Sequence, residues 1–189
     1  MSLTPAKLKI AGPNGVPYAL GMPMWVYVQD VLLARLDPVP LLNTGTELHI
    51  EAFEPTRVVR EERRHVGKVI FLEICAHIAE NFQQIQAIRF ALSRQVDLFS
   101  GGGTELAASR SETMMRIGAV DVRMTPRSDA KSGHFVVSGT WVYSERNYAH
   151  LMSVLQEERL NYKDRPIGSR NRDAAGVVAR LRHLVCGRA

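Results

Sequence analysis

The densest group of side chains that could do chemistry lies between residues 57 and 68. Within it, residues 60–68 contain four cations and one glycine: Arg60, Arg63, Arg64, Lys68 and Gly67. An apolar helical pattern follows directly, so the free N–H groups and the positive dipole end of a helix would face the same place. Together these groups predict a site for an anion. The alternative is a core helix that begins with a solvated, charged turn.

The helical pattern behind this turn is the most apolar in the sequence. Val66, Ile70, Ile74, Ile78 and Phe82 repeat every four residues, as on one face of a helix. Four further apolar residues widen the stripe: Val69, Phe71, Leu72 and Cys75. A helix that is apolar on most sides is normally buried. We therefore expect it to pack against a sheet and to bury its thiol.

Other combinations of reactive side chains are weaker. The loop Ser100–Thr104 contains three glycines but lacks the lysine of a nucleotide-binding P-loop. The six histidines show no i, i+4 pair and no Cys–His cluster, so no metal site is expected. No G-x-S-x-G motif occurs. Cys75 lies in the apolar stripe, where a thiol is unreactive.

The rest of the sequence alternates strands with helices. Strands are predicted over 47–53, 85–92, 120–125 and 134–143, the last two as an antiparallel hairpin. Helices are predicted over 104–117, with Gly118 just past the end, and over 144–162, with Ser144 as the cap. A final helix is predicted from Asp173.

Residues 1–45 yield only short pieces. Lys7–Ile10 favours a short strand and Met24–Leu33 favours another, whereas Val31–Leu36 fits a strand or a helix equally well. Prolines interrupt this region at four positions: Pro17, Pro23, Pro38 and Pro40. No long amphipathic helix is predicted before residue 58.

Residues 59–69 resemble the acyl-CoA pyrophosphate loop of the GNAT superfamily of N-acyltransferases. That loop reads roughly V-x-P-E-Y-[QR]-x-x-G-x-[GA] and opens the central helix of the family. Four positions match it: Val59, Glu62, Arg64 and Gly67. Glu61 stands in place of the proline, and Val69 in place of the last glycine or alanine. Residues 113–119 stand where the family has F-Y-x-K-x-G-F, with Arg116 and Gly118 corresponding, so the resemblance covers about residues 46–143.

The resemblance implies a single mixed α/β sheet with a central buried helix, followed here by C-terminal helices. It also implies that acyl-CoA is a co-substrate and that an acyl group passes to an amine on a small molecule or a protein. The residues implied to bind acyl-CoA are Arg64, His65, Val66, Gly67, Lys68 and Val69.

The same resemblance implies a strand carboxylate that removes a proton from the amine, often through water. Glu51 is the candidate, since it shares a strand face with Glu47, while Glu54 lies nearer the loop. The alternative is that these groups are solvated strand carboxylates. The tyrosine that often serves the family as general acid falls on Met114, which cannot donate a proton.

Length and charge divide the chain in two. A chain of 189 residues that is 46% hydrophobic predicts one sizeable core, which we place in a domain over residues 1–162. Seven of the 24 basic and two of the 19 acidic residues lie in 163–189, so this segment accounts for the whole net charge of +5. We expect a basic helical appendage at 163–189. An alternative function follows: a non-catalytic GNAT-like module that binds a protein or an anionic partner through this segment.

The remaining expectations concern compartment and partners. Two cysteines far apart in sequence suggest no disulfide, which favours the reducing cytoplasm. No signal-peptide pattern and no apolar run of transmembrane length occur, so no membrane contact is expected. The aromatic residues do not interleave with the basic tail, which argues against specific reading of nucleic acid. An exposed strand edge or the C-terminal helices could form a homodimer.

Overall fold

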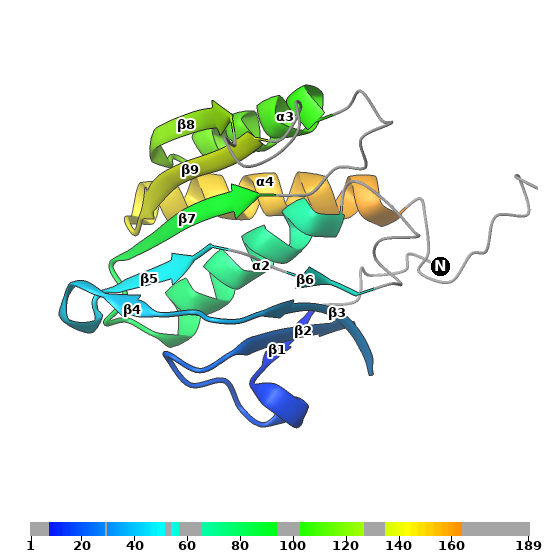
Figure 1. Ribbon diagram of the computed structural model, residues 1–189, viewed down its shortest axis with the longest axis vertical. Coiled ribbons are helices and arrows are strands. Elements are labelled where there is room, and N and C mark those ends of the chain that lie inside the picture. Colours follow the sequence, from blue (N-terminus) through cyan, green and yellow to red (C-terminus); the bar gives the residue numbers. More distant parts are fainter. Residues whose placement is uncertain are drawn as a thin grey trace, which may run out of the picture.

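The computed structural model describes residues 8–28, 30–51, 54–56, 66–93, 103–126 and 135–163 (Figure 1). The strands are β1 (Lys9–Ala11), β2 (Met24–Val28), β3 (Val31–Leu36), β4 (Leu41–Leu42), β5 (Glu47–Ile50), β6 (Glu54–Pro55), β7 (Ala87–Ser93), β8 (Val120–Pro126) and β9 (Phe135–Val142). The α-helices are α2 (Val66–Asn81), α3 (Gly103–Arg116) and α4 (Glu145–Lys163). Two short 3-10 turns are η1 (Pro13–Gly15) and η2 (Asn43–Gly45).

The described strands pair as two sheets. One is antiparallel, in the order β1-β2-β3-β6, and the other is mixed, in the order β4-β5-β7-β9-β8, with β5 parallel to β7. The predicted α/β class with a central buried helix is confirmed, but the sequence led us to expect one sheet. Alternation identifies a strand without identifying its neighbours. The change of sheet between β5 and β6 therefore had no signal in the sequence.

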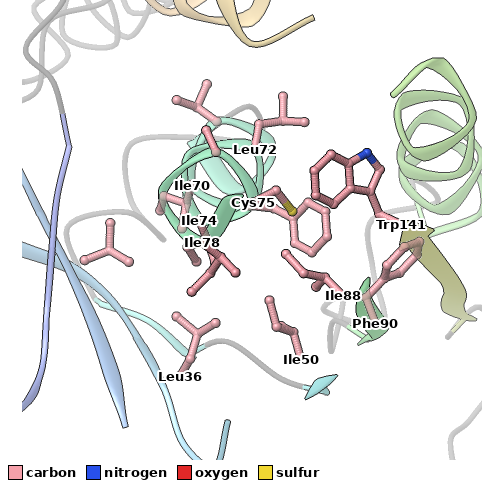
Figure 2. Close-up of a cluster of buried hydrophobic side chains, with 14 of the residues drawn as sticks. Leu36, Ile50, Ile70, Leu72, Ile74, Cys75, Ile78, Ile88, Phe90 and Trp141 are labelled. Carbon is pink, nitrogen blue, oxygen red and sulfur yellow. The ribbon is translucent and has the colours of Figure 1, made fainter. Parts of the chain in front are cut away.

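Helix α2 forms the centre of the core, as its apolar pattern predicts. Side chains from both sheets surround it, including Leu36 of β3, Ile50 of β5, Ile88 of β7 and Trp141 of β9 (Figure 2). On the helix itself the buried residues lie on most sides: Val69, Ile70, Phe71, Leu72, Ile74, Cys75, Ala76 and Ile78. Fully burying side chains of this size contributes roughly 1.5–3 kcal/mol each, so α2 joins the two sheets into one core.

Helix α3 and the hairpin that follows it lie where the sequence placed them. Gly118 adopts a left-handed φ of 82°, and its N–H donates to the Met115 carbonyl while the Ala119 N–H donates to that of Met114. This pair of bonds ends a helix on a left-handed residue, which glycine adopts without strain. The Trp141 indole N–H donates to the Ile117 carbonyl at 2.9 Å. That bond fixes the end of α3 against β9.

Helix α4 begins as predicted at Ser144. The Ser144 hydroxyl accepts a hydrogen bond from the Asn147 N–H at 3.1 Å, which caps the first turn. The helix then packs against α2, with Leu151, Val154 and Leu155 buried. The final helix predicted from Asp173 lies outside the described residues.

The N-terminal segment forms a hairpin where one strand was predicted over Met24–Leu33. β2 pairs antiparallel with β3, Met24 lying opposite Leu36 and Val28 opposite Val31. Val31–Leu36, which fitted a strand or a helix, is a strand. The described residues before 57 contain strands and 3-10 turns but no α-helix.

Candidate functional site

The two sheets separate beside Glu51. β5 pairs in parallel with β7 up to Ile50, which lies opposite Phe90. Four residues later the chain is in the other sheet, where Glu54 lies opposite Arg35 and Pro55 opposite Ala34. Glu51 stands at the start of this change and is exposed. Places where neighbouring strands diverge are preferred positions for ligands in α/β folds.

The first turn of α2 lies at the same edge of the five-stranded sheet. The C-terminus of α2 joins β7 through a short connection, so the helix runs back along the sheet from the carboxyl ends of β5 and β7 (Figure 1). The first N–H groups of α2 have no partner within the helix. The carboxyl edge therefore combines an exposed carboxylate with the positive end of a helix dipole.

The residues predicted to bind acyl-CoA are only partly within the described chain. Arg64 and His65 lie outside it, and so does the side chain of Val66. Gly67 is half-buried in the first turn of α2, and Val69 is buried in the core. The Val69 side chain therefore faces away from any ligand at this edge, which leaves only its N–H for such a role.

Lys68 is turned toward α4 rather than toward the edge of the sheet. Its ammonium lies 3.6 Å from a carboxylate oxygen of Glu158, and the two side chains are 13% and 7% exposed. The neighbouring residues of α4 pair as well: Glu157 with Arg116 of α3, and Arg159 with Glu73 of α2 at 2.6 Å. The sequence showed no sign that α4 would supply a counter-ion to Lys68, because the two residues are 90 positions apart.

The strand carboxylates have different surroundings. Glu47 pairs with the guanidinium of Arg89 on β7 at 3.0 Å, so it is held as a structural partner. Glu51 is exposed and forms no ion pair within the described residues. Glu54 is also exposed, and it lies opposite Arg35 in the pairing of β3 and β6. Among the three, Glu51 has the freedom to accept a proton from a ligand at the point where the sheets separate.

His49 is a residue at this site that the sequence reading did not single out. It lies on β5 between Glu47 and Glu51 on the same strand face, opposite Arg89. Its Nδ1 atom is buried and has no hydrogen-bond partner within the described residues. Buried polar atoms usually have a partner. The alternation of Glu47, His49 and Glu51 in the sequence was the available signal.

A second contact that the sequence analysis did not predict links α2 to α4, beyond the first turn of α2. Glu73 is 5% exposed in a helix whose other described buried residues are apolar, and a buried carboxylate needs a partner. Farther along, the Tyr148 hydroxyl donates to Glu80 at 2.8 Å. Partial burial, together with this hydrogen bond, raises the pKa of Tyr148 to about 12. The polar residues of α2 thus mark the line along which α4 packs.

Several other groups are unsuited to catalysis. The predicted burial of Cys75 is confirmed, and this burial raises the pKa of its thiol far above the usual range. Met114, at the position of the family's tyrosine, is buried in the core. Within the described residues, no three side chains of His, Cys, Asp or Glu are grouped so as to hold a metal ion. No helix in the same part of the chain is long and apolar enough to span a membrane.

Comparisons with known proteins give a distant structural likeness. No protein-family model matches the chain, and no curated protein matches it by sequence. The N-terminal domain of Ribosomal-protein-alanine acetyltransferase from Clostridium acetobutylicum ATCC 824 is similar in structure, with a TM-score of 0.44 and 11% sequence identity. The likeness covers 76% of this chain and 95% of that one. At this level it carries no argument about what this chain binds or catalyses.

Proposed function

We propose that the chain is an acyl-CoA-dependent N-acyltransferase that transfers an acyl group to an amine on a small molecule or a protein. The observation that supports this most directly is the change of sheet between β5 and β6. It brings Glu51 and the first turn of α2 to one edge of the molecule. The loop motif of residues 59–69 runs into that turn in the sequence, because residues 66–69 belong to both.

The described residues fit a diphosphate through the backbone. Gly67 has no Cβ and lies in the first turn of α2, where N–H groups have no partner within the helix. Amides arranged in this way bind phosphate oxygens, and the helix dipole adds to the attraction. Gly67, Lys68 and Val69 would contribute N–H groups, and Arg64, His65 and Val66 complete the predicted set. The Lys68 ammonium contributes less, because Glu158 already pairs with it.

Acyl-CoA would supply the acyl group as a thioester, whose C–S bond breaks as the amine forms the new C–N bond. Glu51 would accept the proton that the amine loses, either directly or through a water molecule. The thiolate that leaves must itself take up a proton. Met114 is buried and cannot provide it, so that proton comes from solvent or from another side chain.

Acyl-CoA binding is tested first by thermal shift and calorimetry with acetyl-CoA and a longer acyl-CoA. We expect both to raise the melting temperature, and we expect Gly67→Leu and Arg64→Glu to abolish the shift. Arg123→Glu, which reverses an exposed cation on β8, is the matched control and should leave the shift unchanged. No shift of the natural chain at millimolar ligand would exclude this function.

Catalysis is tested separately with an amine acceptor library. Glu51→Gln should lower kcat by roughly 10²- to 10⁴-fold, the usual contribution of a general base, with the Kd for acyl-CoA unchanged. Glu54→Gln removes an exposed carboxylate a few residues away and should retain activity. Equal kcat values in all three proteins would remove Glu51 from the mechanism.

A non-catalytic module that binds a protein or an anionic partner through residues 163–189 is the second candidate. Two observations favour it: Glu158 neutralises Lys68, and no α-helix is present in the described residues before 57 to form a wall for an acceptor. Reversing Arg180 and Arg182 to Glu should then abolish partner binding while the melting temperature stays constant. A cytoplasmic location and a homodimer remain part of the proposal and are open to fractionation and light scattering.

A further inference from the structure

The outer face of the four-stranded sheet displays large apolar side chains that take no part in the core. Trp25 and Tyr27 lie on β2, and Leu32 lies opposite Tyr27 on β3. All three are half-buried, and none belongs to the core cluster or packs against it. Their strand neighbours Met24 and Val26 are fully buried on the other face. Side chains alternate along a strand, so Trp25 and Tyr27 point away from α2.

Two cations accompany these rings. The Arg35 guanidinium lies 4.8 Å from the centroid of the Trp25 ring, and Lys9 is paired with Tyr27 across β1 and β2. Both cations are exposed. Among the described residues that are paired across strands on this face, Glu54 of β6 is the one carboxylate. It lies opposite Arg35 of β3. The two aromatic rings are 6.5 Å apart and tilted by 47°. We call this set Lys9, Trp25, Tyr27, Leu32 and Arg35 the outer platform.

We propose that the outer platform binds single-stranded nucleic acid without reading its sequence. Half-buried rings on a sheet face offer bases a surface for stacking, and each base has a π-face that can use it. Arg35 adds a cation–π contact and, with Lys9, an attraction for phosphates. Residues 163–189 carry the whole net charge of +5, which favours the approach of a polyanion to the chain but adds nothing specific to the platform.

This inference goes beyond the proposed function and does not depend on it. The platform uses β1, β2 and β3, whereas acyl-CoA would bind at the carboxyl edge of β5 and β7. It also differs from nucleic-acid binding by the basic tail at 163–189, where the aromatic residues do not interleave with the cations. The platform becomes visible only when β2 and β3 are paired. Arg35 is ten residues from Trp25 in the sequence, and the pairing of the two strands brings them together.

The test measures binding of a fluorescein-labelled twelve-nucleotide oligo(dT), and of the RNA oligo(U), to the full chain by anisotropy at 50 mM and 200 mM salt. We expect single strands to bind more tightly than a duplex. Trp25→Ala and Tyr27→Ala should each weaken binding by roughly five- to one-hundred-fold, the range for loss of one stacked base. Intrinsic fluorescence gives a second readout. The chain has two tryptophans and Trp141 is buried, so oligonucleotide quenching reports Trp25.

Substitutions at the same position separate stacking from general apolar contact. Trp25→Phe keeps a ring and should retain most of the binding, whereas Trp25→Leu keeps apolar bulk and should lose it. Arg35→Ala should weaken binding, while Arg123→Ala, which removes an exposed cation from β8, should not. The Phe and Leu variants decide the question even where an alanine variant fails to fold.

Three results would overturn the proposal. Binding that is equal in the natural chain, Trp25→Ala and Tyr27→Ala would assign it to another surface, such as the basic tail. Equal binding by Trp25→Leu and Trp25→Phe would exclude stacking. No oligonucleotide binding, with quenching of Trp25 by a proline-rich peptide instead, would make the platform a peptide site.

Discussion

At the scale of single residues, one of the ion pairs between α2 and α4 joins Arg159 to the buried Glu73. The Arg159 guanidinium donates from Nε to a carboxylate oxygen of Glu73 at 2.7 Å, and the Glu73 side chain is 6% exposed. Desolvating two charges costs about as much as their attraction returns, so the pair adds little net stability. Removing one member still has an effect, because the buried charge that is left loses one of the interactions that compensate its burial.

We therefore expect Arg159→Leu to lower the free energy of unfolding by about 3 kcal/mol, the low end of the range for a broken buried pair. The low end applies because the Arg159 side chain is 27% exposed. Arg116→Leu is the matched control, since it breaks the pair with Glu157, whose members are 39% and 54% exposed. An exposed pair is worth under about 1 kcal/mol. Urea unfolding of both variants would contradict this account if their losses were equal.

Tyr18 makes the free energy of unfolding depend on pH in the alkaline range. Burial raises the pKa of Tyr18 to about 12, whereas a tyrosine in the unfolded chain ionises near pH 10. Above pH 10 the unfolded state therefore binds fewer protons than the folded state, so this group's contribution to stability is lost as pH rises toward 12. Tyr18→Phe should make the fall in unfolding free energy between pH 10 and pH 12 shallower. Parallel curves for the two proteins would show that Tyr18 ionises alike in both states.

At the scale of elements, the junction between α3 and α4 depends on one glycine. A Cβ added to Gly118 would lie 2.4 Å from the Asn147 side-chain oxygen. The amide of Asn147 donates to the Val142 carbonyl at 2.9 Å and so ties the first turn of α4 to the end of β9. Gly118 thus serves two needs, a left-handed backbone and a close approach between two helices.

Gly118→Ala should destabilise the protein by more than a left-handed φ alone explains. Gly15→Ala is the matched control, because Gly15 has a φ of 81° with nothing within 4 Å of an added Cβ. The φ cost is roughly 1–2 kcal/mol at either position. Displacing Asn147 should add about 1 kcal/mol at Gly118, the net value of one hydrogen bond. Thermal unfolding of the two variants measures the difference, and equal losses would mean that Asn147 moves aside freely.

At the scale of the whole molecule, the sequence predicts the elements better than it predicts their partners. Periodicity located α2, β7, α3 and the β8–β9 hairpin, because each is long enough to show its period. It could not show that residues 47–55 serve two sheets, since alternation over 47–53 does not identify the neighbours of a strand and β6 is too short to show a period. It could not show that Lys68 pairs with Glu158, because contacts so distant in sequence arise only from packing. The candidate site was located by a motif, while its electrostatics came from α4.

The same packing predicts how α4 should affect anion binding at the carboxyl edge. Lys68 and Glu158 lie near the first turn of α2, whereas Glu80 and Tyr148 pair near its end, so α4 runs antiparallel to α2. The last turns of α4 therefore place the Glu158 carboxylate where a diphosphate would be attracted. A like charge at roughly 10 Å opposes an anion by about 1–2 kcal/mol at an effective dielectric constant of 20, before screening by salt.

Glu158→Gln should consequently tighten the binding of acetyl-CoA by roughly fivefold at low salt, and less at higher salt. Glu157→Gln is the matched control, because that carboxylate pairs with Arg116 on the exposed side of α4 and should change the Kd little. Titration calorimetry of the three proteins provides the measurement. If the natural chain binds acetyl-CoA and Glu158→Gln binds it no more tightly, Lys68 and Glu158 are structural and the ligand lies elsewhere. If none of the three binds, the non-catalytic module that binds a partner through residues 163–189 becomes the better account of the function.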